Sequence, residues 1–503
     1  MQAFRTKSLD QLQADADSAG TKLKRSLGAT DLIMLGIGAI IGTGIFTSIG
    51  TGVAGDSVRL GAGPGIILSF VLTAIACAFC ALCYAEFASL VPISGSAYTY
   101  SYATLGELIA WIIGWDLIIE YAVGNVAVAI SWAANFHRLV DGLGFHIPAW
   151  LSVDYRSCAQ AAAAVAQAGG EIAPGLALYY EAWMNHPTVL GIPIIFNFLA
   201  FFIVALITWL LVIGVKESAR MNNIMVVIKL IILFFFVVVG FKYVKPGNWT
   251  PFMPNGFGGV WAGASIIFFA YIGFDAISTA AEECKNPGRD MPRGIIGSLV
   301  ICTFIYIIVA AVLTGMVPWK TLGVADPLAA ALAFVQSDVA AGVVAFGAVI
   351  AMSSILLVFQ YGQPRIFFSM SRDGLLPPFF AKVHPKYQTP HVTTIWTGVV
   401  VAAISGIANI NEIVDLTNIG TLFAFVLVCI GIIILRYKDP DRPRSFKTPF
   451  VPLIPILGVI SCIYLMAGLP GITWVRFGIW LLVGFVLYFF YGYWNSRLHP
   501  QNK

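Results

Sequence analysis

The chain has 503 residues, of which 59% are hydrophobic and 11% are charged, and its formal net charge is +4. Soluble domains average about 45 to 50% apolar and about 25% charged residues, so this composition excludes an ordinary soluble protein and indicates one embedded in a membrane. The small positive excess lies in polar stretches beside apolar runs, and it gives no sign of a nucleic-acid partner.

Residues 1–30 are polar and contain no apolar core of a cleavable signal peptide, so the first apolar run is expected to be a true membrane span. Twelve such runs follow, each long enough to cross a hydrocarbon core of about 30 Å. Helices are expected, because backbone groups in lipid must be hydrogen-bonded within the segment. The expected spans are residues 31–53, 64–90, 104–136, 191–214, 219–241, 258–282, 294–317, 338–362, 391–409, 413–436, 450–469 and 474–494.

The polar loops carry unequal charge. If the spans alternate in direction, most of the 29 Lys and Arg residues fall on one side, and the positive-inside rule then places residues 1–30 and the tail 495–503 in the cytoplasm. The one long loop, residues 137–190, is expected on the outer face. The short polar ends fit a multi-pass protein of a bacterial plasma (inner) membrane better than a protein of a eukaryotic cell surface.

The eight cysteines give no disulfide framework, because most of them lie inside spans. Cys77, Cys80 and Cys83 share one helical stripe, which raises the question of a metal site. No His or acidic residue accompanies them before Glu86. They are interpreted as small packing residues, and no metal or cofactor is expected.

Lys229 is a charged residue near the middle of the fifth expected span. About ten residues separate it from the nearer end, which is about 15 Å of helix and more than a lysine side chain can bridge. A charge at mid-bilayer costs about 2.5 to 3.5 kcal/mol, and such residues usually face a bundle interior on an ion or substrate pathway. The alternative is a lysine that only joins two helices through backbone carbonyls.

Clustered glycines interrupt two spans at membrane depth: Gly38, Gly42 and Gly44 in the first, and Gly273 in the sixth. Gly38 and Gly42 fit close helix packing of the small-xxx-small type. The alternative is a broken helix, in which a half-helix N-terminus binds an anion and unwound carbonyls bind a cation. Because the interruptions recur five spans apart, they favour broken helices. The chain then divides into repeats over residues 31–243 and 258–436, with two further helices over residues 450–494.

Together these segments resemble a known family. The sequence is similar to the cationic amino acid transporter branch of the amino acid, polyamine and organocation (APC) superfamily at Gly38 to Phe46, Lys229, Tyr271 to Ala276, Ala281 to Pro287 and Ser369 to Gly374. The resemblance covers almost the whole chain. It implies an all-α membrane protein with a five-plus-five inverted repeat, discontinuous helices 1 and 6, two extra C-terminal helices, and alternating access around a site at the two breaks.

The resemblance also implies a substrate site made largely of main chain. The N–H groups of Thr43 and Gly44, next to Gly42, would bind the carboxylate of an amino acid at the positive end of a half-helix. Backbone carbonyls would bind its ammonium, and the Phe269 ring would close over it. In the eighth span Phe359 would face the substrate side chain, although a simple packing role remains open. The carbonyls belong to Ile40, Ile41, Phe269, Ala270 and Ile272.

Two charged positions have implied roles. Lys229 matches the family's lysine between the first and eighth spans, where its ammonium would bridge the carbonyl of Gly38 and Ser353 or Ser354. Our hypothesis is that protonated Lys229 braces the outward-facing state and that loss of its proton couples transport to protons. The family carries an acid near the cavity at the position of Glu120. Asp116 is a weaker candidate, and Asp275 is either a helix cap or part of a gate.

We therefore expect a secondary active transporter that imports L-amino acids, with protons as the coupled ion and membrane lipid as its surroundings. A neutral, small to medium substrate is favoured, and Glu120 keeps a cationic one open. The alternatives are an amino acid exchanger and an amino acid sensor on the same fold. An enzyme is not expected, because no His lies clearly inside a span, and a channel would not need a site that grips a zwitterion. A small accessory membrane subunit leaves no readable signal.

Overall fold

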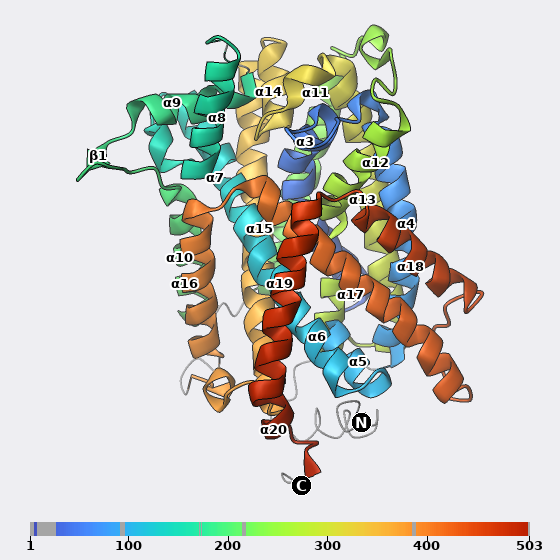
Figure 1. The fold of residues 1–503 in the computed structure, drawn as a ribbon. Coiled ribbons are helices and arrows are strands. Elements are labelled where there is room, and N and C mark those ends of the chain that lie inside the picture. Colours follow the sequence, from blue (N-terminus) through green and yellow to red (C-terminus); the bar gives the residue numbers. More distant parts are fainter. Residues whose placement is uncertain are drawn as a thin grey trace.

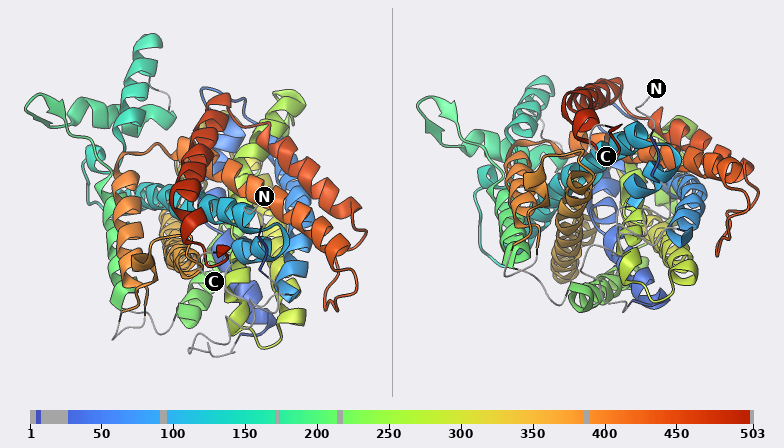
Figure 2. Two further views of the ribbon diagram at one scale, coloured as in Figure 1. Left: turned by 60° about the horizontal axis from the view of Figure 1, so that its bottom comes forward. Right: turned by 90° about the horizontal axis from the view of Figure 1, so that it is seen from below.

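The computed structural model describes residues 5–7, 27–90, 96–170, 172, 174–213, 218–384 and 389–500. Figure 1 shows an upright bundle of helices that run between two opposite ends, with one smaller lobe projecting from its upper left side. The end views in Figure 2 show that the helices of the bundle lie side by side and that the lobe stands outside them.

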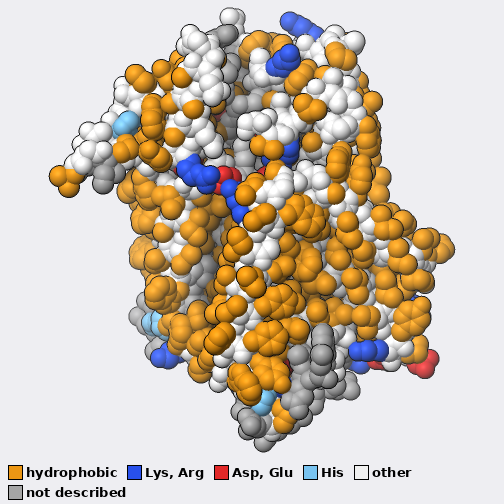
Figure 3. Space-filling view, in the orientation of Figure 1, with side chains coloured by type: hydrophobic (Ala, Val, Ile, Leu, Met, Phe, Trp, Pro, Cys, Tyr) orange, Lys and Arg blue, Asp and Glu red, His pale blue; other side chains and the backbone are white. Residues whose placement is uncertain are grey.

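Nine helical segments of the described chain are long and apolar enough to cross a membrane, and three shorter apolar helices lie among them. Each falls on one of the expected spans, so the expected all-α polytopic fold is confirmed. Their lateral faces expose large apolar side chains, such as Phe202, Phe234 and Phe304, as a surface against lipid would. Figure 3 shows one lateral face of the bundle, which is covered largely by hydrophobic side chains.

The first five spans are built from the following elements: α2 (Ala29–Ile40), η2 (Gly44–Ser48), α3 (Ile49–Ala54), η3 (Gly63–Gly65), α4 (Ile66–Leu90), α5 (Ser96–Thr104), α6 (Glu107–Ile118), η4 (Ile119–Val123), α7 (Gly124–Gly142), α10 (Phe198–Ile213) and α11 (Ser218–Phe241). The labels η2 and η4 mark single π-helical turns, a feature that often occurs at functional sites.

The next five spans contain η7 (Pro246–Trp249), α12 (Gly256–Ile267), η8 (Phe268–Tyr271), η9 (Asp275–Glu283), α13 (Pro287–Met316), η10 (Trp319–Leu322), α14 (Pro327–Phe334), α15 (Asp338–Arg372), η11 (Pro378–Ala381), α16 (His391–Ile407) and α17 (Ile410–Lys438). The last two spans comprise α18 (Leu453–Met466), α19 (Gly471–Leu487), η12 (Tyr488–Gly492) and α20 (Tyr493–Asn495). The exact limits of the two repeats, residues 31–243 and 258–436, stay a prediction.

The projecting lobe is the long loop. It contains η5 (Ala149–Leu151), α8 (Tyr155–Gln167), η6 (Pro174–Leu176), α9 (Ala177–Asn185) and a hairpin of β1 (Thr188–Val189) and β2 (Ile192–Pro193), in which Thr188 faces Pro193 and Val189 faces Ile192. The lobe has a small core of its own around Ala149, Val153, Cys158, Ala182 and Ile195. The side chain of Asp154 caps α8 by accepting a hydrogen bond from the backbone N–H of Ser157. The loop is therefore an ordered structural unit.

Candidate functional site

The first span is broken between Ile40 and Gly44. Helix α2 ends at Ile40, Ile41 adopts an extended conformation (φ −76°, ψ 109°), and η2 starts at Gly44. Helical hydrogen bonding resumes where the N–H groups of Ile45 and Phe46 reach the carbonyl of Gly42. The backbone N–H groups at the start of η2 therefore lie beside an unwound stretch of carbonyls.

The sixth span is broken at the corresponding place. Helix α12 passes into a 3-10 turn, η8, after which Ile272 is extended (φ −60°, ψ 135°) and η9 begins at Asp275. Gly273 has φ +118°, a conformation that favours glycine, and a Cβ there would lie 2.9 Å from the backbone of Ala39. Broken helices at both positions are thus confirmed, in place of continuous helices packed through Gly38 and Gly42.

The two breaks touch each other. A Cβ on Gly44 would lie 2.1 Å from the Cα of Ala270, so only glycine permits this approach. A Cβ on Gly42 would lie 1.9 Å from the Cδ1 atom of Ile355 on α15. The glycines of the first break therefore bring its backbone against both η8 and α15.

A closed cavity with an empty volume of about 240 Å³ lies at this contact. All its lining residues are buried. This space is smaller than a usual small-molecule pocket of about 300 to 1,000 Å³, so the two breaks are closely packed around it in this structure. Six of the residues expected to bind substrate line it, together with three apolar neighbours: Ile40, Thr43, Gly44, Phe269, Ile272 and Phe359, then Ala39, Val128 and Ile355.

The other expected substrate residues lie next to this cavity or behind it. Ile41, Gly42 and Ala270 belong to the breaks but do not line the space. Glu120 also does not line it. It sits in the π-helical turn η4, whose next residue, Tyr121, packs against Phe359 with ring centroids 5.4 Å apart. Glu120 therefore lies outside the cavity lining, next in sequence to a residue that packs on Phe359.

Glu120 and Asp275 are both fully buried acidic residues. Their carboxyl groups lie near each other, and Thr421 and Tyr121 lie near them. In the described part of the chain no donor group completes a hydrogen bond to either carboxyl. Burial of two neighbouring acids without hydrogen-bond partners among the described residues disfavours ionisation of both at once.

Lys229 is fully buried and points at the first break. Its Nζ atom donates hydrogen bonds to the carbonyl oxygen of Gly38 (2.7 Å), the carbonyl oxygen of Ile41 (3.0 Å) and the Oγ atom of Ser354 (2.9 Å). An ammonium has three N–H donors, so these three acceptors satisfy it. The lysine thus joins α11, the unwound backbone and α15, with neutral groups as its three partners.

The sequence also offered Ser353 as a partner of Lys229, and here the structure differs. The Ser353 hydroxyl accepts a hydrogen bond from Trp132 Nε1 (2.9 Å) and donates one to the carbonyl of Val349 (2.8 Å). Successive residues of a helix point about 100° apart, so only one of two adjacent serines can face Lys229. That residue is Ser354.

Tyr306 is a site residue that the sequence analysis missed. Its hydroxyl lies 2.9 Å from the carbonyl oxygen of Ile40 and 2.9 Å from that of Ala270, so it joins the two breaks. The ring is buried against Phe70 and Tyr271, with centroids 5.4 and 5.5 Å away. The sequence feature that could have pointed to Tyr306 is a polar aromatic residue in the middle of the apolar run of α13.

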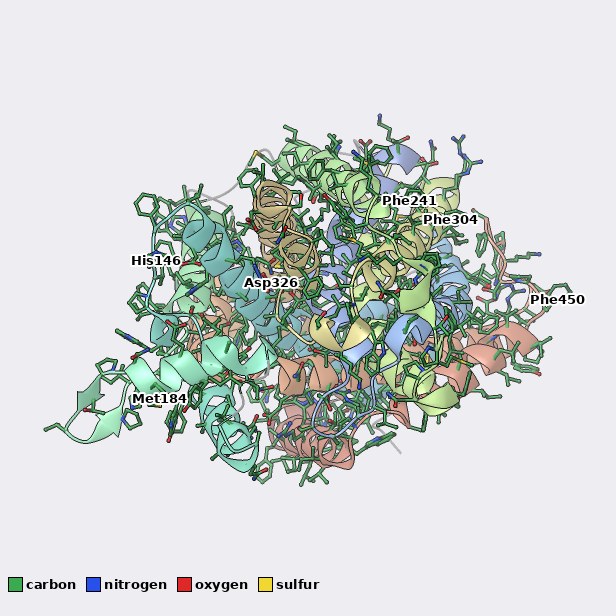
Figure 4. The ribbon with its side chains drawn as sticks, turned by 90° about the horizontal axis from the view of Figure 1, so that it is seen from above. His146, Met184, Phe241, Phe304, Asp326 and Phe450 are labelled. Atoms are coloured by element: carbon green, nitrogen blue, oxygen red, sulfur yellow. The ribbon has the colours of Figure 1, made fainter. Side chains whose placement is uncertain are left out.

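Polar contacts close the cavity from the end where the lobe lies. The hydroxyls of Thr47 and Ser131 are hydrogen-bonded to each other, and both line a wide vestibule above that contact. Arg138 on α7 pairs with Asp326, the residue before α14, and both line the vestibule as well. Figure 4, which looks down on this end, shows Asp326 over the middle of the bundle and His146 towards the lobe.

Cys77, Cys80 and Cys83 lie on α4 as free, buried thiols. The Sγ atom of Cys80 is 3.4 Å from that of Cys462 and 3.9 Å from that of Cys429, contacts that the sequence did not suggest. Among the residues that the structure describes, no group of three or more His, Cys, Asp or Glu side chains has the arrangement of a metal site.

Comparison with known proteins agrees with this geometry. A family model described as amino acid permease matches residues 27–491. Branched-chain amino acid permease BcaP of Bacillus subtilis (strain 168) is 48% identical over 497 residues, covering 99% of both chains. The methylthioribose transporter of the same organism is 46% identical, also with 99% of both chains covered. Cationic amino acid transporter 4, vacuolar, of Arabidopsis thaliana is 33% identical, covering 87% of this chain and 67% of the relative.

The family model covers both breaks, the lysine beside them, the first eleven spans and most of the twelfth. The relatives are a permease and transporters, which agrees with a buried cavity at two broken spans. The chain therefore belongs to the amino acid permease family, in the cationic amino acid transporter branch of the APC superfamily.

Proposed function

We propose that this protein is a proton-coupled secondary transporter that imports L-amino acids across a plasma membrane by alternating access. The observation that carries the proposal is the closed cavity between two broken helices, with Lys229 hydrogen-bonded to one of the breaks. A half-helix N-terminus at Gly44 suits a carboxylate, and unwound carbonyls suit an ammonium. The zwitterionic backbone of an amino acid carries both of these groups.

The substrate that we favour is a neutral amino acid with an apolar side chain. The side chains around the cavity are apolar except for Thr43, whose hydroxyl makes no hydrogen bond within the described structure, and none is charged. A cationic side chain would leave its charge unpaired in such a space, which is costly. The branched-chain permease among the relatives supports the same choice.

Proton coupling is proposed to run through Lys229. As an ammonium it supplies three N–H donors to three acceptors, whereas a neutral amine has only two and no charge. Loss of the proton would therefore release part of the contact between the first break and α15. We assign the protonated form to the state in which Lys229 braces these elements, and we place both chain termini in the cytoplasm.

Methylthioribose is a second candidate substrate, because its transporter is 46% identical to this chain over 99% of both sequences. It is an uncharged thio-sugar, so it has neither the ammonium nor the carboxylate that the two breaks would bind. A transporter for it would need hydroxyl-binding side chains around the cavity. Thr43 is the one lining residue with a side-chain hydroxyl, which favours the amino acid.

The test is a thermal-shift screen of the purified protein against the twenty amino acids and methylthioribose, followed by uptake into liposomes. We expect branched-chain amino acids to stabilise the protein and to be accumulated when the outer solution is acidified. Stabilisation by methylthioribose alone would overturn the amino acid assignment. Uptake that requires internal substrate and ignores the pH gradient would identify an exchanger, and uptake that does not saturate would indicate a channel.

A further inference from the structure

A groove runs along the beginning of α13, between α2 and the segment that follows α17. Its empty volume is about 1590 Å³ including the open solvent above it. It lies at a helix end, separate from the closed cavity and from the vestibule, which share no lining residue with it. The proposed transport site makes no use of it.

One rim of the groove is strongly basic. Lys285, Arg289 and Arg293 line it at intervals of four residues, and all three side chains are exposed. Arg289 contacts the neighbouring Asp290, with Nε and Oδ1 3.2 Å apart. Within the described residues, Lys285 and Arg293 have no side-chain hydrogen bond or ion pair. Two positive charges therefore remain available to an anionic ligand.

The backbone adds to the positive charge of the basic rim. Helix α13 begins at Pro287 inside the groove, and the side chain of Asn286 does not cap it. A helix N-terminus carries partial positive charge, which favours phosphate. Of the first N–H groups of α13, those of Arg289 and Asp290 bond to the carbonyl of Asn286 and Pro287 has none, so the favourable term here is the charge of the helix end. Arginine beside it can bind phosphate oxygens with two parallel N–H groups. The rim thus has the chemistry of a phosphate-binding site.

The floor of the groove is apolar. Ile33 from α2 and Ile296 from α13 line it, and Gly297 packs so closely that a Cβ there would lie 3.2 Å from Ile33. Further along α13, Val300 is 56% exposed and Phe304 is 70% exposed. A basic rim therefore leads directly onto a surface that faces hydrocarbon.

We propose that this groove is a binding site for an anionic phospholipid. The phosphate lies between Lys285, Arg289 and Arg293 at the start of α13, and an acyl chain covers Ile296, Val300 and Phe304. Basic pockets between membrane helices bind anionic lipid head groups in this manner. A free phosphate would use the basic rim but gain nothing from the apolar floor, so the continuity of the two surfaces favours the lipid.

The test uses the purified full-length protein in detergent with three probes: phosphatidylglycerol, phosphatidylcholine and inorganic phosphate. Thermal unfolding measures stabilisation, and native mass spectrometry counts the bound lipid. The variant is K285Q/R289Q/R293Q, and the matched control is K382Q/R497Q, which removes two exposed basic residues outside the groove. R293Q alone serves if the triple variant does not fold.

We expect phosphatidylglycerol to raise the unfolding temperature of the wild type and the control while phosphatidylcholine does not. Each basic group near a membrane surface changes the affinity for an anionic lipid roughly fivefold. The affinity of the triple variant for phosphatidylglycerol should therefore fall about a hundredfold, and that of R293Q about fivefold. Unchanged affinity in both groove variants overturns the proposal. So does equal stabilisation by phosphatidylcholine, or an equal effect of inorganic phosphate, which would indicate a site for a free anion.

Discussion

Lys229 Nζ donates a hydrogen bond to the carbonyl oxygen of Gly38 over 2.7 Å, which joins the middle of α11 to the last turn of α2 before the first break. Because Gly38 and Ile41 both accept from the same ammonium, the lysine spans the point at which helical bonding stops. The position of this one side chain is thereby linked to the conformation of the backbone at the first break.

Lys229→Ala is expected to abolish uptake driven by a pH gradient while leaving exchange between internal and external substrate measurable. The change removes three hydrogen bonds, and bonds of this charged kind contribute about 1.5 to 3 kcal/mol each, so the unfolding temperature should also fall. Liposome uptake with and without an imposed pH gradient is the measurement. Lys242→Ala, at an exposed position after α11, is the control, and full coupling in Lys229→Ala would remove the lysine from the mechanism.

Tyr306→Phe deletes only the hydroxyl that joins the carbonyls of Ile40 and Ala270. A buried acceptor left unsatisfied costs about 1 to 3 kcal/mol, and the lost contact loosens the two breaks relative to each other. We expect substrate affinity to fall about tenfold in a binding assay.

The control for that variant is Thr314→Val on the same helix, since the buried Thr314 hydroxyl bonds to the carbonyl of Ala310, away from both breaks, at 2.8 Å. Equal affinities for the two variants would contradict a specific role of Tyr306.

Gly44→Ala is expected to reduce uptake at least tenfold, because the new Cβ would lie 2.1 Å from the Cα of Ala270 and force the breaks apart. Overpacking of a buried site typically costs about 1 to 3 kcal/mol. Gly258→Ala in α12 is the matched control, since nothing lies within 4 Å of its added Cβ. Transport by Gly44→Ala at the rate of the control would show that the two breaks need not touch.

Phe359→Ala enlarges the apolar end of the cavity, where Phe359 packs against Tyr121. Larger amino acids should then compete for uptake, while affinity for small ones should fall several-fold through lost contact. Competition assays with a size series of amino acids measure this change. Phe304→Ala, at a position that is 70% exposed on the bundle surface, should leave the preference unaltered, and an unaltered preference in Phe359→Ala would place the side chain of the substrate elsewhere.

Much of this architecture could be predicted from the sequence, because the bilayer restricts which residues can follow one another along a membrane span. A span needs about 20 apolar residues, so the spans could be counted. Glycine clusters and a mid-span lysine are costly in lipid, so the two breaks and Lys229 stood out. The long loop was visible for the same reason, although its helices and short hairpin were not.

The contacts between spans were decided only by the tertiary structure, because they depend on how each helix is rotated and how closely the backbones approach. One helical position separates Ser354, which reaches Lys229, from Ser353, which does not. In the π-helical turn Ile119–Val123, Tyr121 packs against Phe359 of the cavity lining and Glu120 lies near Asp275. Hydropathy indicates which residues lie at membrane depth, whereas side-chain direction and close packing decide which of them meet, as the Tyr306 hydroxyl does at Ile40 and Ala270.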